Sequence, residues 1–202
     1  MTCLYPLPAL LALALALAVP ATAEEFESRD SPAAAEQCKT VEEAKDGEGD
    51  WVVRTCEGRA GYLVLLNEDD LRTTISVGTS ITRAKNEPAA SQSFGPFNSA
   101  ADTIEWRGLT GAKPFAIIQR WTLADIEHED KEGRPAGVDL LIVTRLPPGP
   151  VCHVAYVDAQ ANEDAVALAR TAADDSARKF RCGADQVLVV GKPGRAIALA
   201  RH

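Results

Sequence analysis

Four cysteines after residue 23 constrain the fold of this chain more than any other feature of its sequence. They are Cys38, Cys56, Cys152 and Cys182, and a fifth, Cys3, lies in an apolar N-terminal segment. An even number of cysteines in an exported chain is typical of disulfide bonds. Cys38 and Cys56 lie symmetrically about Gly47 in the turn sequence KDGEGD, so we expect them to face each other across a β-hairpin.

The second pair follows from the lengths of two expected elements. Residues 152–159 have the pattern of a strand, and residues 162–180 have that of a helix with Asn162 as its N-cap. A strand of about seven residues and a helix of about sixteen both span about 20 to 25 Å. The helix therefore returns Cys182 to the level of Cys152, which predicts a bond between them. A zinc site is the alternative, but the chain has no CxxC and only three histidines.

The N-terminus has the pattern of a signal peptide. A run rich in Ala and Leu leads to Ala21-Thr22-Ala23, a typical cleavage site, so we expect residues 1–23 to be removed. No second apolar run follows, which predicts no transmembrane anchor after cleavage and a periplasmic or secreted location. Residues 24–37 are polar and Ala-rich, and we expect a flexible tether there. We expect residues 38–202 to form a single disulfide-stabilised α+β domain.

The remaining segments predict a mainly antiparallel sheet. Apolar or alternating runs that predict strands follow the first hairpin at 62–66, 71–79, 102–108, 115–123, 138–146, 152–159 and 186–191, and the tail 195–202 could add one more. The expected fold class is α+β, with a mainly antiparallel sheet of about nine strands, one C-terminal helix packed on it, and two disulfides. Residues 80–101 match neither period, which predicts a long irregular connection.

The balance of charges limits the partners that the chain can bind. It has 21 Lys and Arg against 29 Asp and Glu, a formal net charge of -8. Nucleic acid and anionic lipid both need a basic face, so neither is an expected partner. A basic protein partner or a cationic ligand is the better electrostatic match.

The sequence contains no recognisable catalytic, metal or cofactor motif. His153 follows a cysteine within an expected strand and His128 lies in a charged turn, so we interpret both as structural or solvated. Residues 158–164 are rich in Asp, Asn and Glu but lack the spacing of a calcium loop. Asp102 and Glu105 are predicted to point to opposite faces of one strand, which disfavours a glycosidase pair. We therefore predict no metal and no cofactor.

The segment SQSFGPFNSAADTIEWRG, residues 91–108, is the main candidate for a binding surface. Phe94 and Phe97 flank a Gly-Pro pair that favours a turn, and strand alternation then directs Trp106 to the core and its neighbours outward. Two interpretations stay open. In the first, both phenyl rings turn inward and cap the end of the sheet. In the second, Phe94 and Phe97 form an exposed aromatic platform whose rim is Asn98, Glu105 and Arg107.

Three long segments, taken together with the cysteine pairs, resemble a group of secreted proteins of Gram-negative bacteria. They are GYLVLLNEDDLRTTISVG, SFGPFNSAADTIEWR and YVDAQANEDAVALARTAADDSARKFRCG. The group has no established activity, so the resemblance implies an exported location and a coherent fold. The leading functional hypothesis is a non-catalytic binding module of the bacterial envelope with a basic protein partner. The alternatives are a hydrolase that acts on an envelope polymer through Asp or Glu, and a structural envelope component.

Overall fold

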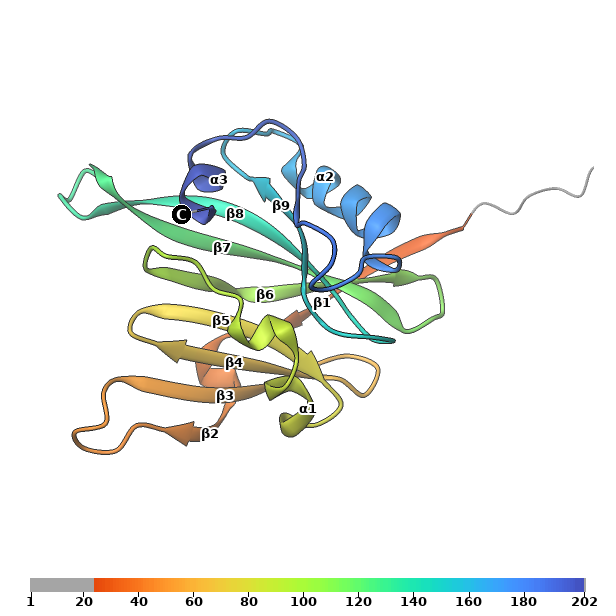
Figure 1. Cartoon of the computed structure of the whole chain (residues 1–202), viewed down its shortest axis with the longest axis horizontal. Helices are drawn as coiled ribbons and strands as arrows, with labels where there is room; N and C mark the ends of the chain where they lie inside the picture. Colours follow the sequence, from red (N-terminus) through yellow and green to blue (C-terminus); the bar gives the residue numbers. More distant parts are fainter. Residues whose placement is uncertain (1–23, 202) are drawn as a thin grey trace, which may run out of the picture.

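The computed structural model describes residues 24–201, in which two β-sheets and a helix form three layers (Figure 1). The expected signal peptide, residues 1–23, lies outside the described residues. The larger sheet has the strand order β1-β6-β7-β8-β9-β10, and the smaller sheet has the order β2-β3-β4-β5. Neighbouring strands pair antiparallel except β9 and β10, which are parallel. The predicted fold class is confirmed, with its strands divided between two sheets.

The strands are β1 Phe26–Pro32, β2 Lys39–Glu43, β3 Trp51–Glu57, β4 Leu63–Asp69, β5 Arg72–Gly78, β6 Asn98–Leu109, β7 Pro114–Glu129, β8 Pro135–Arg145, β9 His153–Asp158 and β10 Leu188–Val189. The α-helices are α1 Ile81–Lys85, α2 Ala165–Ala172 and α3 Arg195–Ala200. A π-helical turn over Ala173–Ala177 continues α2 into a 13-residue helix. Two 3-10 turns span Ala35–Gln37 and Pro88–Ser91.

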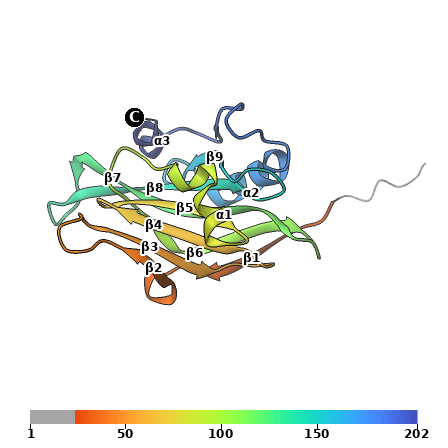
Figure 2. The same cartoon turned by 60° about the horizontal axis from the view of Figure 1, so that its bottom comes forward.

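The main core lies between the two sheets. Each sheet contributes an alternating set of buried side chains, among them Val64 and Ile75 from the smaller sheet and Trp106 and Trp121 from the larger one. Tyr62 stacks on Trp106, with ring centroids 6.4 Å apart. Figure 2 shows the smaller sheet in front of β1 and β6. Because side chains alternate along a strand, the outer face of the larger sheet needs a second cover.

Helix α2 and its π-helical continuation supply that cover. Their buried residues are small, namely Ala165, Ala169, Ala172, Ala173 and Ala177, so the helix backbone packs close to the sheet. The prediction of Asn162 as the N-cap is wrong, because the cap position is Asp164. The Asn162 side chain instead donates to the carbonyl of Lys192 at 2.9 Å and accepts its N–H at 2.8 Å. It therefore joins the start of the helix to the loop that precedes α3.

Residues 24–37 are not the tether that the sequence predicts, because β1 pairs with β6 along its whole length. Two side-chain contacts reinforce this ladder. Phe26 packs edge-on against Phe115, with ring centroids 6.0 Å apart, and Ser31 Oγ accepts a 2.8 Å hydrogen bond from Trp106 Nε1. The polar composition that suggested a tether belongs to an edge strand, which has one partner strand and needs few apolar residues.

The tail beyond residue 194 is the helix α3 and not the expected strand. Asp158 accepts the N–H of Ala196 at 2.9 Å, so a buried carboxylate satisfies a donor that the first turn of a helix leaves free. Arg195 adds an ion pair to the buried Asp125, with 2.5 Å between Nη2 and Oδ1. These contacts fasten α3 to the ends of β9 and β7 and favour helix over an added strand.

Both predicted disulfides are confirmed. Cys38 bonds to Cys56 with 4.4 Å between Cα atoms, and Cys152 bonds to Cys182 with 5.9 Å between Cα atoms. Disulfides are typical of proteins that fold in an oxidising compartment outside the cytoplasm. Within residues 24–201, no helix has the length and apolar character needed to cross a membrane.

Candidate functional site: an acidic groove beside Phe97

The hairpin turn between β4 and β5 places a large apolar side chain in solvent. Asp69 pairs with Arg72, and the two residues between them, Asp70 and Leu71, have φ angles of 46° and 60°. Positive φ at both positions is the pattern of a type I′ hairpin turn, which favours Asn, Asp and Gly. A leucine there costs about 1 kcal/mol in backbone strain. Leu71 is also 67% exposed, so both its backbone and its side chain are unfavourable for stability and suit a role in binding.

The connection between β5 and β6 turns its two phenylalanines in opposite directions. Phe94 is buried, and its ring lies 5.5 Å from Trp121 and 5.5 Å from Tyr156, measured between centroids. Phe97 is 42% exposed, and the guanidinium of Arg72 lies 4.9 Å from its ring centroid. Phe94 therefore belongs to the core, while Phe97 is an exposed aromatic side chain at the protein surface.

Asn98 holds the backbone beneath Phe97 in place. Its Oδ1 accepts the N–H of Thr73 at 3.0 Å, and its Nδ2 donates to the carbonyl of Pro96 at 2.9 Å. The N–H of Asn98 donates to the carbonyl of Leu71 at 2.9 Å. Asn98 is buried, so its hydrogen bonds join β6 to β5, and it does not form part of an exposed rim.

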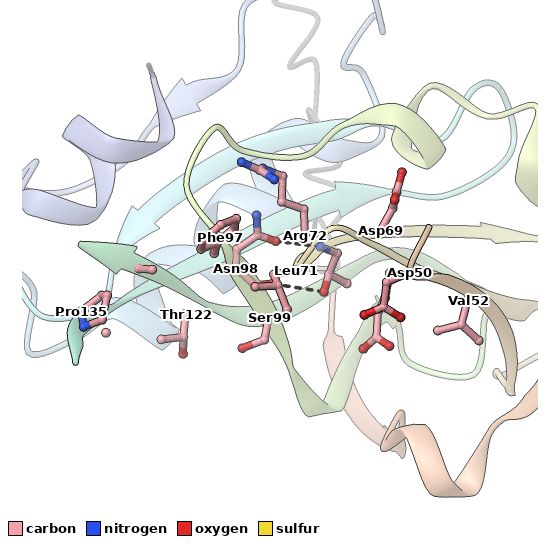
Figure 3. A pocket seen from close by; sticks show the side chains of 14 residues that line it. Asp50, Val52, Asp69, Leu71, Arg72, Phe97, Asn98, Ser99, Thr122 and Pro135 are labelled. Atoms are coloured by element: carbon pink, nitrogen blue, oxygen red, sulfur yellow. Dashed lines mark hydrogen bonds between the residues drawn. The ribbon is translucent and has the colours of Figure 1, made fainter. Parts of the chain in front are cut away.

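Phe97 and Leu71 border a groove of about 480 Å³ between the β4–β5 turn and the start of β6 (Figure 3). We call it the acidic groove. Its lining residues are Asp50, Val52, Glu68, Asp69, Leu71, Arg72, Thr73, Phe97, Asn98, Ser99, Thr122, Ala124, Pro135 and Gly137. Figure 3 shows Asp50 and Asp69 on one side, Phe97 and Pro135 on the other, and Leu71 between them. The groove thus combines carboxylates with an apolar surface.

The charges of the groove are mostly negative. Arg72, its one basic lining residue, is already paired with Asp70 at 2.8 Å, and Glu68 is paired with Arg54. Asp50 and Asp69 are exposed and form no ion pair with any of residues 24–201. Two carboxylates are therefore free to meet a cation that enters the groove.

Glu105 and Arg107 do not face solvent as the sequence predicts, because the helix covers their side of β6. Arg107 forms a paired contact with Asp174, at 2.8 Å from Nε and 2.7 Å from Nη2. Glu105 accepts two hydrogen bonds from Arg170, at 2.7 and 3.1 Å. Their predicted orientation away from the buried Trp106 is confirmed, but they fasten the sheet to the helix and do not line the acidic groove.

Of the five residues predicted to form a binding surface, the structure therefore places only Phe97 and Asn98 in the acidic groove. Asp50 comes from the end of the β2–β3 connection, and Glu68, Asp69 and Leu71 come from the β4–β5 hairpin; the sequence did not identify them as a binding surface. The segment NEDDL, residues 67–71, is the part of the sequence that could have pointed to this surface, because leucine is unusual in a tight hairpin turn.

The two internal histidines and the carboxylate clusters offer no metal centre in the described part of the chain. Residues 24–201 contain no group of three His, Cys, Asp or Glu side chains placed to hold a metal ion. Burial lowers the pKa of His153 to about 3, so its ring is neutral, and its Nδ1 lies 2.9 Å from the Tyr156 hydroxyl. His128 lies at the surface with its Nδ1 2.8 Å from Asp125.

Comparison with known proteins identifies no relative. The chain matches no protein family, no curated protein and no solved structure at a significant level. The resemblance to secreted proteins of Gram-negative bacteria stays a prediction, and the function must be inferred from the groove itself.

Proposed function

We propose that this chain is an exported, non-catalytic binding module that holds a cationic segment of a partner protein in the acidic groove. The observation that carries the proposal is the combination of two free carboxylates, Asp50 and Asp69, with two exposed apolar side chains, Leu71 and Phe97. A bacterial periplasm or the extracellular space is the proposed location, which the two disulfides support.

Charge and apolar contact have different roles in the proposed recognition of a partner by the acidic groove. A Lys or Arg of the partner would meet Asp50 or Asp69, and the formal net charge of -8 would speed the encounter over a longer range. Aliphatic or aromatic neighbours of that cation would pack on Leu71 and Phe97, because large exposed apolar side chains are where binding energy concentrates. Charge thus determines which partners associate rapidly, and the apolar contact determines how slowly they dissociate.

The experiment begins with capture of basic proteins from an envelope extract on immobilised residues 24–202. The dissociation constant of the captured protein is then measured for two groove variants, Phe97→Ala and Asp69→Asn. We expect Phe97→Ala to weaken binding about ten-fold or more. Asp69→Asn should weaken binding less, mainly by slowing association, and should reduce the effect of salt on the dissociation constant.

Two matched controls separate the groove from the rest of the surface. Leu188→Ala removes an apolar side chain that is about as exposed as Phe97 but lies in β10. Asp175→Asn removes an exposed carboxylate on the helix. Binding that falls equally in groove and control variants, or that falls in none of them, would rule out the groove as the recognition surface.

A further inference from the structure

A second hollow, of about 480 Å³, lies at the opposite end of the β7–β8 pair from the acidic groove. The acidic groove borders the stretch where Ala124 pairs with Gly137, and the second hollow borders the stretch where Ala116 pairs with Arg145. Eight residues of extended strand separate the two places, which is about 26 Å. We call the second hollow the Arg145 pocket.

The lining of the Arg145 pocket is apolar and positively charged. Six of its nine lining residues carry an apolar or aromatic side chain, among them Tyr62, Phe115 and Leu146, and the other three are Lys113, Arg145 and Arg178. The lining includes no carboxylate. In a chain of net charge -8, a pocket with three cations and no acid has the electrostatic character of an anion site.

Arg145 is a buried cation without a counter-ion. Only 8% of the residue is exposed, and its Nη1 and Nη2 donate to the backbone carbonyls of Phe180 and Pro148. Its Nε is buried and has no hydrogen-bond partner, and no carboxylate among residues 24–201 pairs with it. A buried guanidinium with no carboxylate beside it is unfavourable until an anion comes near it. The same features favour the binding of an anion.

The two other cations of the pocket differ in whether an ion pair neutralises them. Arg178 is neutralised by Glu24, with 2.6 Å between Nη2 and Oε2, and its guanidinium lies 5.2 Å from the ring centroid of Phe115. Lys113 is exposed and forms no ion pair with residues 24–201, and its Nζ lies 5.8 Å from the ring centroid of Tyr62. Lys113 and Arg145 therefore carry the two uncompensated charges of the pocket.

We propose that the Arg145 pocket binds a small carboxylic acid with an apolar body. The carboxylate would lie beside Lys113 and Arg145, where charge-assisted hydrogen bonds are the strongest that such a group forms. The apolar body would pack on Tyr62 and Phe115 within a pocket whose lining is mostly apolar. This site is independent of the acidic groove and takes a ligand of opposite charge.

The test uses 4-phenylbutyrate as the probe and its uncharged amide as the matched comparison. Binding to residues 24–202 is followed by changes in the backbone amide resonances of the residues that line the pocket. We expect the acid to bind at least ten-fold more tightly than the amide, because only the acid supplies an anion to Arg145. Equal binding of the two compounds, or no change in these resonances up to about 10 mM acid, would overturn the proposal.

Variants of the pocket cations complete the test. Lys113→Glu should weaken the acid about ten-fold and leave the fold intact, because Lys113 is exposed. Lys131→Glu is the matched control, since it makes the same charge change at an exposed site in the β7–β8 hairpin. Equal effects of Lys113→Glu and Lys131→Glu would overturn the proposal. Arg145→Lys and Arg145→Met, compared after circular dichroism shows that both fold, should retain and lose binding of the acid respectively.

Discussion

His153 allows the aromatic core to be tested through the pH dependence of stability. The residue is buried in β9, its ring centroid lies 6.1 Å from that of Phe94 and 6.2 Å from that of Trp121, and its Nδ1 lies 2.9 Å from the Tyr156 hydroxyl. Burial lowers the pKa of His153 to about 3, against an ordinary value of about 6.5. Burial also raises the pKa of Tyr156 to about 12, so both partners stay neutral across the physiological range.

The sign and size of the effect follow from this pKa. As pH falls below about 6.5, the unfolded chain binds a proton at His153, while the folded chain does not until the pH approaches 3. The contribution of His153 is therefore complete above pH 6.5 and is lost as pH falls from there toward 3, at about 1.4 kcal/mol per pH unit. Between pH 7 and pH 5 the free energy of unfolding should decrease by about 2 kcal/mol on this account.

Urea denaturation followed by tryptophan fluorescence, at intervals from pH 7.5 to pH 5, measures this decrease. His153→Gln is the comparison, because glutamine keeps a polar group near Tyr156 but does not titrate. The difference in free energy of unfolding between the wild type and His153→Gln should shrink by about 2 kcal/mol over this range. The two chains share every other titratable group, so the pH dependence that those groups contribute cancels in the difference. Parallel pH profiles for the two chains would refute the assignment of His153 as a buried neutral residue.

Two further predictions concern the contacts that join the layers. Arg107→Gln should lower the free energy of unfolding by about 2 to 4 kcal/mol, because it leaves the carboxylate of Asp174, which is 14% exposed, without its partner. Arg134→Gln removes a side chain that is 71% exposed and should cost less than about 1 kcal/mol. Equal losses for the two variants in urea denaturation would contradict this account of Arg107. Replacing both Cys152 and Cys182 by Ala removes a bond that spans 30 residues and should lower the free energy of unfolding by about 3 to 4 kcal/mol. Urea denaturation measures this loss. A loss below about 1 kcal/mol would show that the bond does not constrain the unfolded chain.

Two of the features that the sequence predicts correctly depend only on neighbouring residues. The alternation around Trp106 indicates its inward orientation, and the symmetric spacing about Gly47 indicates the first disulfide. Both patterns are complete within a short segment, so no knowledge of distant contacts is needed.

The features that the sequence does not predict depend on partners far along the chain. β1 forms because it can pair with the edge of β6, more than sixty residues later in the chain. The composition of β1 itself gives little indication of a strand. Glu105 and Arg107 point away from Trp106 as predicted, yet only Arg170 and Asp174 of the helix decide that this face is covered. The acidic groove likewise joins two segments, around Asp69 and around Phe97, that no local pattern brings together.

The surroundings of Phe97 explain why an exposed aromatic ring there suits recognition. Phe94 anchors the loop before Phe97 in the core, and the hydrogen bonds of Asn98 anchor the backbone after it. The carbonyl of Phe97 itself accepts the N–H of Ala124 at 2.8 Å, and Arg72 lies over its ring. Exposure of Phe97 is therefore imposed by its neighbours and does not reflect a loose loop. Because little conformational freedom remains to be lost when a partner packs on this ring, more of the contact energy is available for binding.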